Sequence, residues 1–198
     1  INSLKYLEQN YWNKINNLSS ITFFEDPSER LKHQLEINQI KDDDYDLLSE
    51  IGRNWIRTGK INPIKYIRYL FPFTRKAKNF FYSDHHFSHA FYGYGLSGFN
   101  EGYVLVIDAL GQNQTTTLYY FKDGEMPKKI IENKLPFSLG YFYSYFTSVL
   151  GFKSNQDEYK VMGLAPYGKP IYEKLILNSI EYSSSECNFR LPKYMYKY

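Results

Sequence analysis

The stretch that most constrains the fold is YVLVIDALGQNQTT, residues Tyr103 to Thr116. Its first residues are aromatic, β-branched or aliphatic, which predicts a buried strand ending at Asp108. Gly111 then allows a turn, and the hydroxyl-rich residues after it begin a second strand. The stretch therefore predicts a hairpin with a carboxylate at a sheet edge. A hairpin turn that merely exposes an aspartate fits the same residues equally well.

The segments around this hairpin read as further strands and helices. Asp123-Gly124 is a turn signal before a strand near Lys129 to Glu132, and Gly151 is placed to end a helix over Leu139 to Leu150. Other strands are expected near Ile21 to Phe24 and Phe80 to Tyr82, and other helices near Leu4 to Ile15, Asp26 to Ile37, Tyr45 to Ile56, His85 to Tyr92 and Ile171 to Ile180. This order predicts a mixed α/β chain.

Cysteine content and targeting signals favour a reducing compartment. Cys187 is the only cysteine, so neither an internal disulfide nor a zinc site with several thiolates can form. The uncharged run from Leu135 to Phe152 contains Pro136 and several hydroxyl groups, which favours a buried helix over a membrane span. We therefore expect a cytoplasmic protein with no membrane partner. A start at Ile1 without a signal peptide also suggests a truncated chain.

The stretch from Ile51 to Ser83 contains no acidic residue, although the net charge of the whole chain is only +3. Its cations are Arg53, Arg57, Lys60, Lys65, Arg68, Arg75, Lys76 and Lys78. Such a stretch suits phosphate or RNA, but a linker that covers an acidic neighbouring surface explains it as simply. Nucleic acid is not the expected partner.

The densest chemical motif is DHHFSHA, residues Asp84 to Ala90. His85 and His89 are four residues apart, so on a helix both imidazoles face one side and can share a metal ion. A zinc-protease helix is disfavoured because His86, and not a glutamate, follows His85. Paired histidines on a surface helix without a metal are the alternative.

Four motifs follow one another along the chain. They are His85-His86-x-x-His89-Ala90, Asp108-x-x-Gly111 with Thr115-Thr116, Pro136-x-Ser138-Leu139-Gly140 continuing to Leu150-Gly151-Phe152, and the run from Glu158-Tyr159-Lys160 to Gly168. This order is similar to that in O-carbamoyltransferases of the nodulation and antibiotic-biosynthesis type. The segment Phe23-Phe24-Glu25-x-Pro27 also resembles the family, so the likeness extends from about Ile21 onward.

The resemblance implies one part of a larger enzyme. In this family a YrdC-like module makes carbamoyl-adenylate from carbamoyl phosphate and ATP, and a module of actin-like ATPase (ASKHA) fold passes the carbamoyl group to a hydroxyl of a small metabolite. This chain resembles the second module, with a partial mixed sheet flanked by helices. Residues 1–78 would be its helical, basic part and residues 79–198 its catalytic core. The chain would be truncated at both ends, without the YrdC-like module, and inactive alone.

The resemblance also implies roles for individual residues. His85, His89 and Asp108 match the family's metal ligands, and two imidazoles with one carboxylate suit iron(II) or zinc. Residues expected near nucleotide or phosphate are Gly111, Thr115, Thr116, Gly140 and the loop that begins at Gly163. Lys160 would neutralise phosphate while Glu158 orients it, although a surface salt bridge is the alternative. His86 would either bind substrate or fill the other face of its helix.

Three departures from the family pattern keep other functions open. They are Ala109, Gln112 and Asp157, of which Gln112 replaces a glutamate. If that glutamate acts as a base, activity is lost while the metal ligands remain. A non-catalytic metal-binding remnant is therefore one alternative. Threonylcarbamoyl transfer in tRNA modification is another, since the basic stretch suits it.

Overall fold

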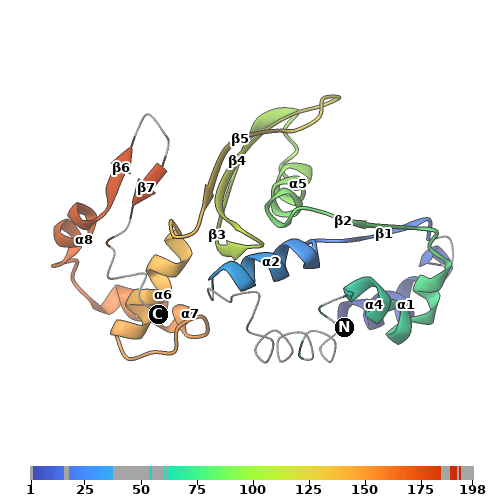
Figure 1. The fold of residues 1–198 in the computed structure, drawn as a ribbon, viewed down its shortest axis with the longest axis horizontal. Coiled ribbons are helices and arrows are strands. Elements are labelled where there is room, and N and C mark those ends of the chain that lie inside the picture. Colours follow the sequence, from blue (N-terminus) through green and yellow to red (C-terminus); the bar gives the residue numbers. More distant parts are fainter. Residues whose placement is uncertain are drawn as a thin grey trace. The chain divides into compact units, whose positions relative to one another are not determined.

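The structure, a computed structural model, describes residues 2–15, 18–37, 54, 60, 62–183, 188–190 and 192. The chain forms two compact units, Ile1–Ser88 and His89–Tyr198. Each unit contains helices and strands (Figure 1), which confirms a mixed α/β fold. The helix expected over Tyr45 to Ile56 lies, apart from Asn54, outside the described residues. The expected division of roles at residue 78 stays a prediction.

The first unit contains a two-stranded parallel sheet. Strand β1 (Ser20–Phe23) pairs with β2 (Asn79–Tyr82) in a register that runs from Ser20↔Asn79 to Phe23↔Tyr82. Parallel strands need a long crossover, and the described residues between these two strands include helices. The described part of this unit contains the helical elements α1 (Asn2–Ile15), α2 (Pro27–Ile37), α4 (Pro63–Leu70) and the 3₁₀ helix η1 (Pro72–Lys76). Buried apolar residues among those described in this unit include Ile64, Phe71, Phe73 and Ala77.

Polar caps begin two of these helices. The Asp26 carboxylate accepts the Ser28 backbone N–H at 2.8 Å, and Pro27 is the first residue of α2, as the sequence predicts. Asn62 caps α4 by accepting the Lys65 backbone N–H at 2.8 Å. Helix α4 is not among the predicted elements, because its eight residues are too few to display a helical period clearly.

The second unit contains a three-stranded antiparallel sheet in the order β3-β4-β5. Its strands are β3 (Glu101–Gly111), β4 (Gln114–Lys122) and β5 (Lys128–Lys134). Helix α5 (His85–Ser97) precedes the sheet. The elements after it are α6 (Leu139–Val149), α7 (Glu158–Leu164), the 3₁₀ helix η2 (Ala165–Tyr167), α8 (Glu173–Ser179), β6 (Glu181–Ser183) and β7 (Asn188–Arg190).

The predicted turns are confirmed at two positions and differ at one. Gly124 takes a φ of 78° between β4 and β5, and Gly151 takes a φ of 84° after α6. In the hairpin between β3 and β4, Gln112 and not Gly111 has a positive φ, at 59°. Gly111 instead ends β3 and pairs with Gln114. The turn therefore begins one residue later than the sequence suggests.

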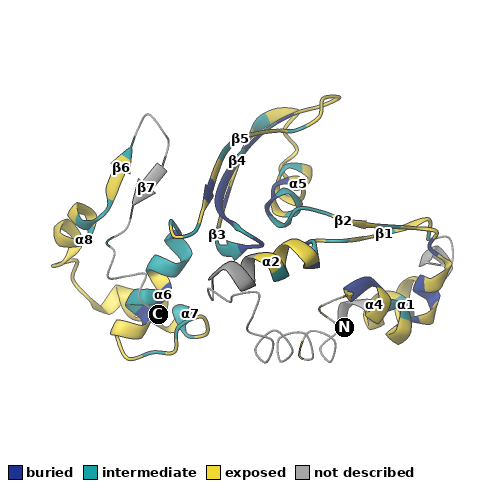
Figure 2. Ribbon diagram, in the orientation of Figure 1, coloured by how far each residue is buried: buried dark blue, intermediate teal, exposed yellow. Residues whose placement is uncertain are grey.

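One face of this sheet is covered by a helix, and the other face carries exposed side chains of β3. Helix α5 packs on one face, where the Tyr94 ring stacks on Phe121 with centroids 4.7 Å apart. Figure 2 shows that burial in this sheet is concentrated along β4. On the other face of β3, Tyr103, Leu105 and Ile107 are exposed. The expectation that this strand is buried is therefore wrong for alternate residues, because successive side chains of a strand point to opposite faces.

Helix α6 is the helix predicted within the uncharged run. It spans 11 residues and buries Ser144 and Thr147. A membrane crossing needs about 20 apolar residues. No helix in the described ranges of the chain has the length and apolar character that a membrane span requires.

Candidate metal centre

Helix α5 carries the two predicted histidine ligands. Asp84 caps the helix, because its Oδ1 accepts the Phe87 backbone N–H at 2.8 Å. The cap fixes the start of the helix at His85, so His85 and His89 lie one turn apart on the same side. His85 is half-buried and His89 is exposed.

Asp108 approaches this side of the helix from β3. Residues two apart on a strand share a face, so Asp108 lies on the face that carries Val104 and Val106. That face meets α5, since a Cβ added at Gly93 would lie 3.8 Å from Val104 Cγ1. The Asp108 carboxylate accepts the Ala109 backbone N–H at 2.7 Å, which limits the rotation of the side chain.

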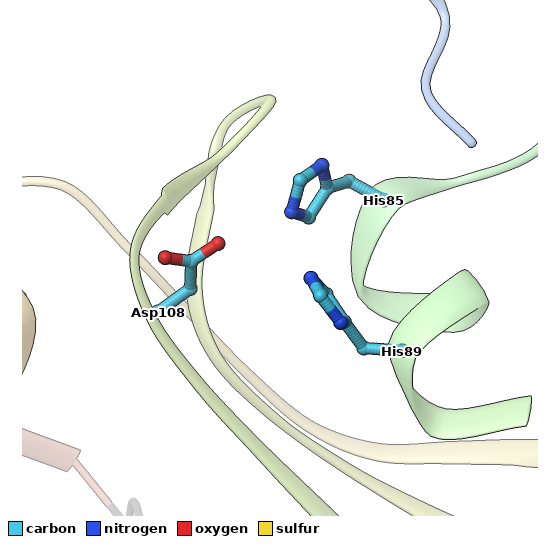
Figure 3. Close-up of side chains that lie close together, drawn as sticks. All are labelled: His85, His89 and Asp108. Carbon is cyan, nitrogen blue, oxygen red and sulfur yellow. The ribbon is translucent and has the colours of Figure 1, made fainter. Parts of the chain in front are cut away.

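The structure brings the three predicted ligands together. One ligand atom from each of His85, His89 and Asp108 lies within 4.8 Å of the other two, and Figure 3 shows the side chains pointing toward one another. Two ligands bonded to one ion at about 2.1 Å are at most about 4.2 Å apart. Small side-chain rotations therefore close the group on one ion. Two imidazoles and one carboxylate fit iron(II) or zinc better than magnesium or calcium, which prefer oxygen ligands.

A buried carboxylate contacts His85. Glu25 Oε2 lies 3.4 Å from His85 Nδ1, and Oε1 accepts a hydrogen bond from the Arg30 guanidinium. Burial by itself raises the pKa of Glu25, but hydrogen bonding to His85 and Arg30, together with their positive charges, lowers it below its usual value. Glu25 is thus an anion beside a candidate ligand. In the sequence, Glu25 lies in the segment Phe23-Phe24-Glu25-x-Pro27, which resembles the family. That segment alone does not indicate a chemical role for Glu25.

The residues expected to bind nucleotide differ in whether their side chains already have hydrogen-bond partners within the protein. Gly111 and Thr115 are buried, and the Thr115 hydroxyl donates to the Phe137 carbonyl, so this hydroxyl already has a structural partner. Thr116 lies on β4 opposite Ile107 of β3. Its Oγ1 is buried and has no hydrogen-bond partner among the residues that the structure describes. Of the two threonines, Thr116 is therefore the one whose hydroxyl has no structural partner among the described residues.

Gly140 lies against the backbone of β3 at the start of α6. Ser138 caps this helix by accepting the Tyr141 backbone N–H at 3.1 Å, and its hydroxyl donates to the Ala109 carbonyl at 2.7 Å. A Cβ at Gly140 would lie 2.4 Å from Ala109 Cα. The glycine is thus required for close packing of helix on strand, which is a sufficient reason for it without an anion.

The partner predicted for Lys160 is wrong. The Lys160 Nζ lies 2.9 Å from Asp157 Oδ1, whereas Glu158 accepts hydrogen bonds from the Ser144 hydroxyl at 2.7 Å and the Asn155 backbone N–H at 2.6 Å. Helical neighbours three residues apart share a face and those two apart do not, which favours Asp157 over Glu158. Hydrogen bonding within the pair lowers the pKa of Asp157 and raises that of Lys160, and the Ser144 hydrogen bond lowers the pKa of Glu158.

The structure places His86 in the protein interior and Gly163 within a helix. His86 is fully buried, as is Ala90 one turn later, so His86 is on an inward face of α5. This placement favours its packing role over contact with substrate. Gly163 lies within α7 and not in the expected glycine loop. A Cβ at Gly163 would meet no described atom within 4 Å.

The chain has relatives among known proteins. Residues 54–198 match the family described as "Carbamoyltransferase N-terminus". The chain is 38% identical over 125 residues to the uncharacterized protein sll1178 of Synechocystis, which covers 63% of the chain and 20% of that protein. It is 39% identical over 87 residues to nodulation protein NolNO of Sinorhizobium fredii, covering 44% of the chain and 12% of that protein. Nodulation protein NolO of Bradyrhizobium diazoefficiens is 38% identical over 87 residues, with coverages of 44% and 16%. The matched segment thus spans 20% or less of each of these three proteins.

Proposed function

This chain belongs to the carbamoyltransferase amino-terminal family, and we propose on that basis that it is the carbamoyl-transferring part of an O-carbamoyltransferase. Its reaction moves a carbamoyl group from carbamoyl-adenylate to a hydroxyl of a small metabolite. Carbamoyl phosphate and ATP are the sources of this donor, which a YrdC-like module makes. The cytoplasm is the compartment in which these substrates and a reduced Cys187 fit best.

An actin-like ATPase (ASKHA) arrangement is the proposed architecture of the catalytic region. It is supported by the antiparallel sheet β3-β4-β5 with α5 on one face, and by the hairpin of β3 and β4 that follows Asp108. The exposed alternate residues of β3 fit a sheet that is larger or further covered in a longer protein.

The observation that carries the functional proposal is the convergence of His85, His89 and Asp108. These side chains would hold one divalent ion, iron(II) or zinc. When bound, the ion supplies a Lewis acid that polarises the carbamoyl carbonyl. The exposed position of His89 leaves one side of the group open to substrate.

Glu25 orients His85 within this group. A ligating imidazole donates its other ring N–H to a carboxylate or carbonyl, which fixes the tautomer and raises the basicity of the ligating nitrogen. Since Nδ1 of His85 faces Glu25, Nε2 is the nitrogen that binds the ion. Arg30 limits the movement of Glu25 from the opposite side. Glu25 is accordingly a positioning residue.

Thr116 and Lys160 are assigned to the phosphate and nucleotide part of the donor. A buried hydroxyl without a partner costs free energy, which a ligand oxygen offsets by accepting a hydrogen bond from Thr116. Lys160 supplies a flexible positive charge, and Asp157 restrains its ammonium group. Gly111 and Gly140 shape the backbone around Asp108.

Transfer of a labelled carbamoyl group tests the proposal. The chain is incubated with ATP, labelled carbamoyl phosphate, a separately supplied YrdC-like protein and a panel of hydroxyl compounds. Label transferred to an acceptor, above the level that the YrdC-like protein produces alone and lost in His89→Ala, supports the assignment. Equal transfer by the wild type and by His89→Ala contradicts it. Turnover of ATP and carbamoyl phosphate by the chain alone also contradicts the division of labour.

Threonylcarbamoyl transfer to tRNA is the second candidate. The cations Lys65, Arg68 and Arg75 around one cavity of the first unit favour it, because tRNA is a polyanion. Replacing the hydroxyl panel by threonine, bicarbonate and unmodified tRNA distinguishes the two reactions. Label in tRNA and not in a small metabolite would identify the second.

A further inference from the structure

A second polar site lies in the first unit, apart from the residues assigned to carbamoyl transfer. It is a cavity of about 650 Å³, a volume within the usual range for small-molecule sites. Three cations and three aromatic rings contribute to its wall: Lys65, Arg68, Arg75, Tyr69, Phe80 and Tyr82. No carboxylate lines it among the described residues.

The spacing of these residues along α4 and β2 places their side chains on common faces of those elements. Lys65, Arg68 and Tyr69 are spaced i, i+3 and i+4 on α4, so they share one face of that helix. Phe80 and Tyr82 are two residues apart on β2 and share one face of the strand. The cavity wall thus combines one face of α4, one face of β2 and Arg75 of η1.

The cations of this wall are not neutralised. None of Lys65, Arg68 and Arg75 forms an ion pair in the part of the chain that the structure describes. Like charges that line one cavity repel one another, and an anion removes that cost. Arg68 is half-buried, whereas Lys65 and Arg75 are exposed, and cations clustered without acidic neighbours are suited to an anionic ligand.

The two arginines are held in place for such a ligand. The Arg68 guanidinium lies over the Phe80 ring, 4.7 Å from its centroid, so its flat face is covered while its edge N–H groups stay available. Arg75 Nε donates to the Arg68 backbone carbonyl at 3.0 Å, which holds the Arg75 side chain against the last turn of α4. Planar guanidinium edges match phosphate oxygens in a bidentate manner. The exposed Tyr69 ring offers a surface for stacking.

We propose that this cavity binds a phosphate-bearing molecule with a planar ring, of nucleotide type, at a site separate from the proposed donor site. The arginines and Lys65 bind the phosphate, and an aromatic ring of the wall stacks on the planar group. The same chemistry is presented by a free nucleotide and by a nucleotide within single-stranded RNA. A cavity of about 650 Å³ has room for a single nucleotide, which favours the free nucleotide over a strand of RNA.

Calorimetric titration of the full 198-residue chain with AMP tests the proposal. Adenosine, inorganic phosphate and a short single-stranded RNA are titrated alongside. AMP should bind, adenosine should bind more weakly, and phosphate should compete with AMP. Arg68→Gln and Arg75→Gln should each weaken AMP binding by about tenfold or more, since each removes a charge-assisted hydrogen bond. Arg68→Lys should fall between, because it keeps the charge but loses the planar fork.

Matched variants locate the site. Lys78→Gln removes a cation from the same basic stretch but outside the cavity wall, and should change AMP affinity by less than about twofold. Circular dichroism confirms that each variant is folded. The proposal is overturned if AMP and phosphate fail to bind at millimolar concentration, or if Thr116→Val and not Arg68→Gln abolishes AMP binding. Binding of RNA without binding of AMP also overturns it, in favour of a nucleic-acid surface.

Discussion

Gly140 lies so close to Ala109 that a Cβ on the glycine would be 2.4 Å from Ala109 Cα and 2.6 Å from its backbone nitrogen. Ala109 follows Asp108, so this contact fixes the first turn of α6 against the backbone beside a candidate ligand. The Ser138 hydroxyl bonds the Ala109 carbonyl at the same place. Packing of helix on strand and the geometry of the candidate metal centre are thus coupled.

Gly140→Ala should destabilise the protein by about 1–3 kcal/mol, because backbone atoms of Ala109 occupy the position of the new methyl group. Chemical denaturation gives the free energy of unfolding. Gly95→Ala is the control, since Gly95 is also helical and a Cβ there meets no described atom within 4 Å. This control should stabilise by up to about 1 kcal/mol. Equal effects of both substitutions would contradict the packing argument.

His89→Ala should lose bound divalent metal, because two ligands remain where three converge. Elemental analysis after dialysis against iron(II) or zinc measures the metal content. Asp123→Asn serves as the control, because it removes a carboxylate of the same unit that bonds Tyr94 and not the ligand group. Wild-type metal content in His89→Ala would refute the assignment of the three ligands.

Glu25→Gln should weaken metal binding by about 10- to 100-fold, because it removes the anion beside His85 Nδ1 while preserving side-chain shape. Competition with a chelator measures the affinity, and imidazole NMR reports the tautomer of His85. Glu29→Gln, an exposed carboxylate of α2, is the matched control. If Glu25→Gln lowers stability but leaves affinity and tautomer unchanged, Glu25 serves only to pair with Arg30.

Lys160→Met should weaken binding of a carbamoyl-adenylate analogue while metal content stays unchanged, because it removes a positive charge from the proposed phosphate contact. Asp157→Asn should have the same effect more mildly, since Asp157 is the carboxylate paired with Lys160. Equilibrium binding of the analogue provides the measurement. A larger loss in Glu158→Gln than in Asp157→Asn would restore the pairing suggested by the sequence and contradict the one observed.

Glu132 should contribute to the acid dependence of stability. Burial by itself raises its pKa, but hydrogen bonds from Lys129 and Gln114 and the charges of Lys129 and Lys134 lower it below 4.5. The folded state therefore binds fewer protons than the unfolded state, so this contribution is complete above about pH 4.5 and is lost as the pH falls through the folded pKa.

Glu132→Gln should accordingly flatten the acid limb of the unfolding free energy while costing less than about 1 kcal/mol at pH 7. Denaturation series between pH 7 and acid pH provide the comparison. Glu173→Gln, an exposed carboxylate of α8, is the control. An unchanged acid limb in Glu132→Gln would show that the contacts with Lys129 and Gln114 do not persist in solution.

The sequence by itself determined the local elements and the positions of the histidines. Runs of aromatic, β-branched and hydroxyl-bearing residues predict the strands β3 and β4, and glycines mark the turns at Gly124 and Gly151, because residue preference and backbone freedom are properties of a few successive residues. The spacing of His85 and His89 likewise fixes their common side once a helix forms. Short elements such as α4 and α7 lack enough residues to display a period.

Only the tertiary structure decided which groups meet. Asp108 reaches the histidines because α5 packs on one face of the sheet, and a strand pattern does not specify which face a helix will cover. Glu25 is distant from His85 in sequence and contacts it only through the fold of the first unit. The close approach of Gly140 to Ala109 depends on two elements packing together, and the backbone distance that makes a glycine necessary exists only after they do.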